Sequence, residues 1–156
     1  MSLNFLSNLF KNEEKFILFP DPFSNFTISI PQSWKFDSNV VIDEGRYSIC
    51  FEKPNREAQV CIYVDTNIIS DDFETFAKKR FNDPSSGSLG TISLSSFQNQ
   101  KCLQKSFTFR SSSLFDGKII ALKKKNFYEI IIHQKSPPSD SLLKEIEKIL
   151  NSIILK

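Results

Sequence analysis

The sequence predicts an α+β fold, in which a single, largely antiparallel sheet of about six to eight strands carries helices on one face. Two observations support this class: several segments alternate apolar and polar residues, as half-buried strands do, and single amphipathic segments interrupt these runs. The expected order is helix, about four strands, helix, about four strands, helix, unlike the regular alternation of parallel sheets. With 156 residues the chain forms one domain, 1–156, in which a helix at 2–15 precedes a core at 24–156.

The first elements lie on either side of a proline break. Residues 2–15 carry leucines and a phenylalanine at helical spacing, which predicts a short amphipathic helix. The prolines within residues 20–22 stop any helix. Residues 26–30 alternate with a period of two and predict a strand that ends at Pro31, after which a turn delivers Trp34 to the core.

The clearest strands form a hairpin around Pro54. Residues 47–52 and 58–65 each alternate apolar and polar side chains. The two apolar sets must share one face, because a slip of one residue would turn a whole set toward solvent. The expected cross-strand pairs are Phe51 with Val60 and Ile49 with Ile62.

This register also positions two of the three cysteines. Cys50 comes opposite Cys61, or offset from it by two residues, on the other face of the hairpin. Directly paired cysteines are a strained site for a disulfide, and three cysteines do not make a disulfide framework. We therefore expect Cys50, Cys61 and Cys102 to be free thiols in a reducing cytoplasm.

The remaining elements repeat these patterns. A helix is predicted over 70–82 with Ser70 or Asp71 as its cap, and a last helix begins near Ser139 or Ser141. The apolar stripes of the helices need a surface to cover. One face of the sheet supplies it, and the opposite face is expected to stay open. The other predicted elements are a short strand at 39–44, a loop at 82–88, strands at 89–96 and 103–109, a turn at 111–117, and a hairpin of 119–125 with 127–134.

Composition argues against several kinds of site. Only 4 glycines speak against glycine-rich phosphate loops, and a net charge of +2 provides no excess for binding nucleic acid. The single histidine, His133, stands at the end of a strand, and the sequence offers no Ser–His or Cys–His pair. The cysteines lack metal-binding spacing. We therefore expect no enzyme, no cofactor and no metal site.

Location and assembly follow from the chain's apolar segments. The first residues show no signal-peptide pattern, and no run of about 18 apolar residues could span a bilayer. We expect a cytoplasmic protein without a membrane span. Monomer and homodimer both stay open, because the helix at 2–15 could cap its own sheet or pair with another chain.

Residues 26–34 (FTISIPQSW) resemble the F-x-I-x-x-P-x-x-W opening of the superfamily that includes PsbP, DcrB and the nuclear-transport cofactor Mog. The order of elements over 24–156 is similar too, with a long hairpin, a phenylalanine-rich middle helix and a closing helix that ends at 149–152. The resemblance implies an antiparallel sheet with helices packed on it, in binding modules that lack a shared catalytic site.

Residues 54–65 are similar to the R-E-A hairpin segment of the DcrB-like effector-associated chaperones of type VI secretion, with Arg56, Glu57 and Ala58 at the matching positions. This resemblance implies a small cytoplasmic, commonly dimeric protein that shields apolar helices of a secreted effector. The predicted helix at 2–15 departs from the pattern of those chaperones.

Two hypotheses of different class follow. The first is a non-enzymatic protein-binding module, a chaperone or adaptor for a secreted or apolar partner. Its contact surface would be the open sheet face or the Leu114–Phe115 pair, which stands in a polar turn and is either an exposed contact or folded back onto the core. The second is a small-molecule or lipid-binding domain with a pocket between helix and sheet. The residues expected on the open face are Gln59, Tyr63 and Gln104.

Overall fold

The computed structural model describes residues 14–37, 44–67, 72–82 and 90–156. The predicted helix at 2–15 and the predicted strand at 39–44 fall almost entirely outside these ranges. The elements within them are β1 (Phe16–Pro20), β2 (Phe26–Pro31), β3 (Lys35–Asp37), β4 (Arg46–Glu52), the 3₁₀ turn η1 (Pro54–Arg56), β5 (Ala58–Asp65), α2 (Phe73–Phe81), β6 (Ile92–Phe97), β7 (Gln100–Arg110), β8 (Leu114–Lys123), β9 (Phe127–Lys135), α3 (Asp140–Ser152) and β10 (Ile154–Leu155).

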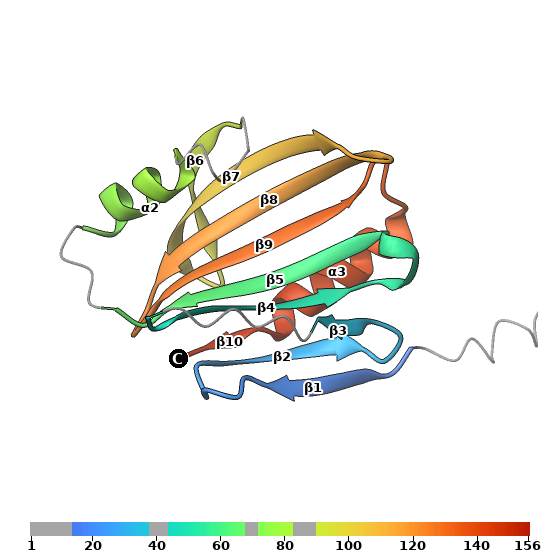
Figure 1. Cartoon of the computed structure of the whole chain (residues 1–156), viewed down its shortest axis with the longest axis horizontal. Coiled ribbons are helices and arrows are strands. Elements are labelled where there is room, and N and C mark those ends of the chain that lie inside the picture. Colours follow the sequence, from blue (N-terminus) through green and yellow to red (C-terminus); the bar gives the residue numbers. More distant parts are fainter. Residues whose placement is uncertain (1–13, 38–43, 68–71, 83–89) are drawn as a thin grey trace, which may run out of the picture.

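The described strands form two antiparallel sheets. The larger sheet has seven strands in the order β3-β4-β5-β9-β8-β7-β6, and the smaller has three in the order β1-β2-β10 (Figure 1). The predicted α+β class with a large antiparallel sheet is confirmed. The structure differs in that β2 pairs with β1 and β10 in a sheet of its own.

The predicted register of the β4–β5 hairpin is confirmed. Phe51 lies opposite Val60 and Ile49 opposite Ile62. The turn at Asn126 between β8 and β9 is confirmed as well. The predicted turn at 111–117 is shorter, because Leu114 to Gly117 already belong to β8. There Gly117 is paired with β7 on one side and β9 on the other, which overrides the turn signal of the Asp-Gly dipeptide.

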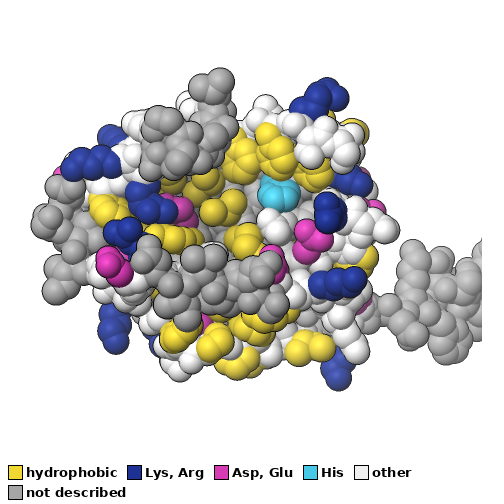
Figure 2. Space-filling model, viewed as in Figure 1, with side chains coloured by type: hydrophobic (Ala, Val, Ile, Leu, Met, Phe, Trp, Pro, Cys, Tyr) yellow, Lys and Arg dark blue, Asp and Glu magenta, His cyan; other side chains and the backbone are white. Residues whose placement is uncertain are grey.

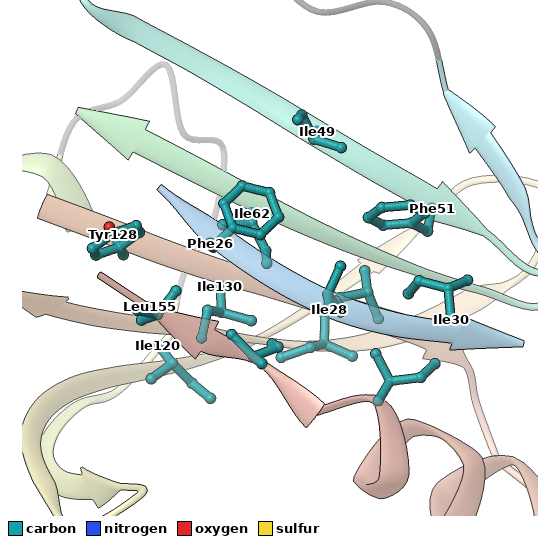
Figure 3. Packing of buried hydrophobic residues seen from close by; sticks show 14 of the residues in the cluster. Phe26, Ile28, Ile30, Ile49, Phe51, Ile62, Ile120, Tyr128, Ile130 and Leu155 are labelled. Atoms are coloured by element: carbon teal, nitrogen blue, oxygen red, sulfur yellow. The ribbon is translucent and has the colours of Figure 1, made fainter. Parts of the chain in front are cut away.

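The main core lies between one face of the large sheet, the small sheet and α3. Ile28 of β2, Ile62 of β5 and Ile130 of β9 are completely buried there, and Figure 3 shows their side chains converging. Ser139 caps α3, and its hydroxyl oxygen accepts a hydrogen bond from the Leu142 amide at 3.1 Å. The residues that α3 buries are Leu142, Ile146 and Ile149.

A buried polar cluster joins the two sheets at one end of this core. The Tyr128 hydroxyl contacts the backbone oxygens of Asn25 at 2.9 Å and of Lys156 at 2.8 Å, and the Asn126 amide donates to the Asn25 side chain at 2.9 Å. The Tyr47 hydroxyl donates to the buried Asp21 carboxylate. Because buried polar groups are costly unless they are paired, this cluster admits one arrangement of the β1–β2 hairpin against the large sheet.

The other described helix, α2, packs on the face of the large sheet opposite α3. Ala77 and Phe81 of α2 are buried against Leu103, Ala121 and Phe127. In β8, Ala121 alternates with the adjacent Ile120 and Leu122, which belong to the main core. The prediction placed all helices on one face, whereas α2 and α3 cover opposite faces. α2 begins at Phe73 with Asp72 as its cap, and the predicted caps lie outside the described residues.

The structure contradicts the prediction that all three cysteines are free. Cys50 and Cys61 lie directly opposite each other, as the register predicts, and they form a disulfide. Their Cα atoms are 4.1 Å apart, close to the spacing of about 4.5 Å in a non-hydrogen-bonded antiparallel pair. The two side chains share a face at this spacing, so direct opposition brings the sulfur atoms together. Cys102 is free and buried.

A thiol titration tests this pairing. Protein that is denatured without reductant, after purification with a thiol-blocking reagent present during lysis, is expected to show one reactive thiol, that of Cys102. Reduction should raise the count to three, and Cys102→Ala should bring the unreduced count to zero. Three thiols before reduction, or a count that does not rise on reduction, would contradict the disulfide.

Candidate functional site

The candidate site is the part of the α2 face of the large sheet that lies beyond α2. We call the side chains of Phe107, Phe109, Phe115 and His133 the aromatic patch. They come from β7, β8 and β9, where the strand register places Phe109 beside Phe115 and Gly117 between Phe107 and His133. Figure 2 shows hydrophobic side chains gathered beside the histidine on this face.

The rings of the patch are packed in an ordered way. Phe109 and Phe115 stack with their centroids 4.9 Å apart and their planes at 5°. The His133 ring stands at right angles to both, with its centroid 5.4 Å from that of Phe109 and 5.6 Å from that of Phe115. Edge-to-face and stacked pairs at these distances are favourable beyond the area that they bury. The patch is therefore a rigid apolar surface around one imidazole.

Gly117 makes room for the patch. A Cβ at this position would lie 2.2 Å from Cζ of Phe107, so the phenyl ring occupies the space that any other side chain would need. Glycine in a strand often marks such a close approach, and an aromatic ring on the next strand covers the exposed backbone. This pairing holds Phe107 flat against the sheet.

The environment of His133 is apolar on one side and polar on the other. Burial among the phenylalanine rings lowers the pKa of His133 below its ordinary 6.5, while the negative charge of Glu52 acts in the opposite direction. Gln59 lies opposite His133 on β5, and Glu52 lies opposite Gln59 on β4. A row of three polar side chains thus crosses the sheet, with His133 of the patch at one end.

The predicted contact residues are only partly brought together. Gln59 and Tyr63 alternate along the same side of β5 and share the face of the patch, since they lie opposite His133 and Glu129. Gln104 pairs with Ile120, so its side chain lies on the opposite face, beside the buried Cys102. The prediction of one open face for all three residues is therefore wrong for Gln104.

The Leu114–Phe115 pair is also not an exposed turn. Phe115 is 7% exposed and belongs to the patch as a strand residue, whereas Leu114 is 38% exposed. Of the two alternatives for Phe115, the ring packed onto the fold is the correct one. The exposed ring of the patch is that of Phe109, at 37%. Phe109 was not singled out from the sequence as a contact residue, although the alternation of Phe107 and Phe109 on one side of a predicted strand was a usable signal.

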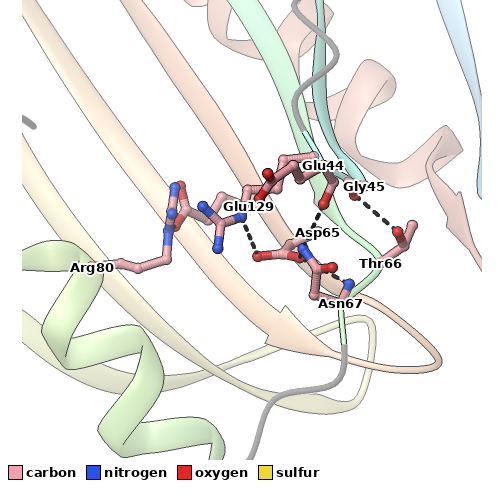
Figure 4. Close-up of polar contacts among 8 residues, drawn as sticks. Glu44, Gly45, Asp65, Thr66, Asn67, Arg80 and Glu129 are labelled. Atoms are coloured by element: carbon pink, nitrogen blue, oxygen red, sulfur yellow. Dashed lines mark hydrogen bonds and ion pairs between the residues drawn. The ribbon is translucent and has the colours of Figure 1, made fainter.

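Tyr63 contacts a network of charged side chains at the α2 end of the same face. The guanidinium carbon of Arg80 lies 4.4 Å from the centre of the Tyr63 ring, and Arg80 Nε is 2.6 Å from Glu129 Oε1. Arg46 Nε is 3.1 Å from Asp65 Oδ2. Figure 4 shows Arg80, Glu129 and Asp65 at this end of the face. The side chains of Asp65 and Glu129 are 1% and 8% exposed, so each carboxylate needs its arginine. The network fixes α2 to the sheet and leaves Tyr63 little freedom as a contact residue.

A concave feature lies on the other side of the large sheet, beside α3. A cavity of about 460 Å³ is present beside α3 and the start of β1. Its volume falls within the range of ligand pockets. The cavity is lined by Glu14, Phe16, Ser141, Lys144, Glu145 and Lys148.

Two further properties concern the described part of the chain only. Within it, no three or more His, Cys, Asp or Glu side chains come together in a way that could hold a metal ion. Neither of its two α-helices has the length and apolar character needed to cross a membrane.

Comparison with known proteins identifies the fold. No protein-family model and no curated protein matches the sequence. The structure is similar to the cyanobacterial PsbP protein (CyanoP) of Synechocystis sp. PCC 6803, with a TM-score of 0.63 and 10% identity over 94% of this chain and 96% of that one. It is also similar to a protein of Bacteroides thetaiotaomicron VPI-5482, with a TM-score of 0.63 and 17% identity over 89% of this chain. This chain spans only 48% of that protein, about half its length.

A weaker similarity, with a TM-score of 0.46 and 11% identity over 100% of this chain and 98% of the other, exists to LpqN of Mycobacterium tuberculosis, a protein involved in cell envelope biogenesis. The similarity to CyanoP confirms the PsbP-like fold that the sequence predicted. At these identities the similarity concerns the fold alone.

The contact between Gly117 and Phe107 can be tested by a mutant cycle. Gly117→Ala is expected to lower the free energy of unfolding by about 1–2 kcal/mol, because the new methyl group must displace the ring. In a Phe107→Val background the same substitution should cost less, since the ring is absent. Denaturant unfolding measures all four proteins, and equal costs in both backgrounds would show that the two residues do not interact.

The depressed pKa of His133 predicts a pH dependence of stability. The unfolded chain takes up the proton at a higher pH than the folded chain, so stability is lost as the pH falls below about 6.5. Between about pH 7 and pH 5, denaturant unfolding should show a steeper loss of the free energy of unfolding for the wild type than for His133→Gln. The variant is the control, because its carboxylates are the same as those of the wild type. A wild type that gains stability on acidification relative to the variant would refute the lowered pKa.

Proposed function

We propose that the protein is a non-enzymatic binding module and that its aromatic patch receives an apolar segment of another protein. The observation that carries this proposal is that the Phe109 ring is exposed and packs in an ordered way against the rings of Phe115 and His133. Exposed apolar patches of this kind are typical of interaction sites, and aromatic residues on a rigid support supply much of the energy of protein interfaces. The half-buried Ile131 extends the apolar strip along β9.

The environment of His133 also favours binding over catalysis. A histidine that acts as a base needs a nucleophile or a polarising partner within hydrogen-bonding reach. The side chains beside His133 are two phenylalanine rings at right angles to it and, across the sheet, Gln59 with Glu52 beyond it, and none of these offers a hydroxyl or thiol nucleophile. In this setting the imidazole provides one polar group at the edge of an apolar surface, where it can orient a bound segment.

A chaperone or adaptor is the most specific form of this function. The partner would then be an apolar helix, for example that of a secreted effector, which needs cover until it reaches its destination. The support is the resemblance of residues 54–65 to the hairpin of DcrB-like chaperones, together with a patch on the same sheet as that hairpin. The row of Gln59 and Glu52 would place polar groups beside the bound helix.

Site-specific photo-crosslinking tests this function. A photoreactive amino acid replaces Phe109 in one protein and Leu143, an apolar residue of α3 that is somewhat more exposed, in the control. Crosslinking in the source cells is expected to trap the partner from position 109 and not from position 143. In a binding assay with the identified partner segment, Phe109→Ser should weaken the affinity by about tenfold or more, and Leu143→Ser should leave it unchanged.

Two results would overturn the proposal. One is the same set of crosslinks from both positions. The other is an affinity for the identified segment that is unaffected by Phe109→Ser, provided that denaturant unfolding shows the variant to be folded.

A further inference from the structure

The cavity beside α3 differs from the aromatic patch in position and in chemistry. α3 packs on the face of the large sheet that lies opposite the patch, so the two sites have no residue in common. Four of the six side chains that line the cavity carry charges, two negative and two positive. What the cavity can bind depends on which of these charges are already compensated.

Both carboxylates of the cavity are engaged within the protein. Glu145 accepts a hydrogen bond from Trp34 Nε1 through one oxygen and is paired with Lys53 Nζ at 2.9 Å through the other. Glu14 accepts a hydrogen bond from the Ser33 amide at 2.9 Å. These contacts hold the Trp34 turn against α3. The charge of Glu145 is compensated by Lys53, whereas Glu14 has one hydrogen bond from a backbone amide.

The two lysines of the cavity are in the opposite situation. Lys144 and Lys148 are four residues apart on α3 and therefore project from the same side of the helix. Among the described residues, neither ammonium group has a carboxylate within ion-pairing distance. Lys148 Nζ lies 5.9 Å from the centre of the Phe16 ring. The cavity thus presents two uncompensated positive charges over an aromatic surface.

The position of Ser141 adds to this character. It lies in the first turn of α3, where the helix dipole favours negative charge, and its hydroxyl can donate a hydrogen bond. The cavity therefore combines the positive charges of Lys144 and Lys148, the hydroxyl donor of Ser141 and the apolar ring of Phe16.

We infer that this cavity binds a small anionic ligand with a short apolar part. Its carboxylate or phosphate group lies between Lys144 and Lys148 and accepts a hydrogen bond from Ser141, and its hydrocarbon part packs on Phe16. This inference is independent of the proposed protein-binding function, because it concerns different residues on the other side of the sheet. A free amphiphile and a lipid headgroup share this chemistry, and the experiment separates them.

Amide-resolved NMR titration with octyl phosphate tests the site. Saturable shifts are expected at residues 141–148, and octanol, which has no charge, should produce none. Lys144→Gln/Lys148→Gln should weaken the binding of octyl phosphate by about tenfold or more, since charge-assisted contacts are lost. Lys78→Gln/Lys125→Gln removes the same charge elsewhere on the surface and should bind as the wild type does.

Sedimentation with vesicles of phosphatidylcholine and phosphatidylglycerol identifies the source of the anion. Vesicle binding in addition to octyl phosphate binding indicates a lipid headgroup, and octyl phosphate binding alone indicates a free ligand. Vesicle binding without octyl phosphate binding would overturn the cavity site in favour of a basic surface. Absence of saturable shifts, or equal affinity of the Lys144→Gln/Lys148→Gln variant, would overturn it as well.

Discussion

Everything else in this fold depends on the burial of one face of the seven-stranded sheet beneath α3 and the small sheet. Ile28, Ile62 and Ile130 meet there without contact with water. Burial of such side chains is the dominant favourable term in folding, and it requires one register for each strand, because a slip of one residue would bring the polar side to the core. The buried cluster around Tyr128 adds specificity, since its hydrogen bonds form only when β2 and the C-terminal residues reach their places.

Once that face is fixed, the composition of the opposite face follows from the alternation of each strand. At one end, Asp65 and Glu129 are compensated by arginines, and α2 is held there. At the other end the alternate positions carry Phe107, Phe109, Phe115 and His133, and of these Phe107 borders the apolar cluster beneath α2. The face therefore has a closed, charged end and an open, aromatic end. A binding function needs this asymmetry, because the network keeps the support rigid while the patch remains accessible.

The sequence was sufficient for features that depend on local alternation and insufficient for those that depend on distant pairing. The β4–β5 register could be predicted, because both strands are apolar on alternate positions and are joined by a short loop. By contrast, β10 has two residues, and β1 lacks alternation in its FILF run, so only their pairing with β2 defines them. Gln104 was assigned to the wrong face of the sheet. Alternation shows which residues of β7 share a side, but it does not show which side of β7 is on the same face as Tyr63 of β5. That depends on the registers of β8 and β9, which lie between β7 and β5.

The cysteines show how one correction alters a conclusion about environment. The expectation of a reducing cytoplasm depended on free thiols, and a disulfide between Cys50 and Cys61 removes that support, because such bonds persist mainly in oxidising compartments. The bond closes a hairpin whose register is already set by the ladder and by the buried Ile49 and Ile62. A disulfide acts largely by restricting the unfolded chain. Cys61 lies opposite Ile131 of β9, the strand that also carries His133, so the bond borders the aromatic patch and should change the stability of the sheet without altering this register.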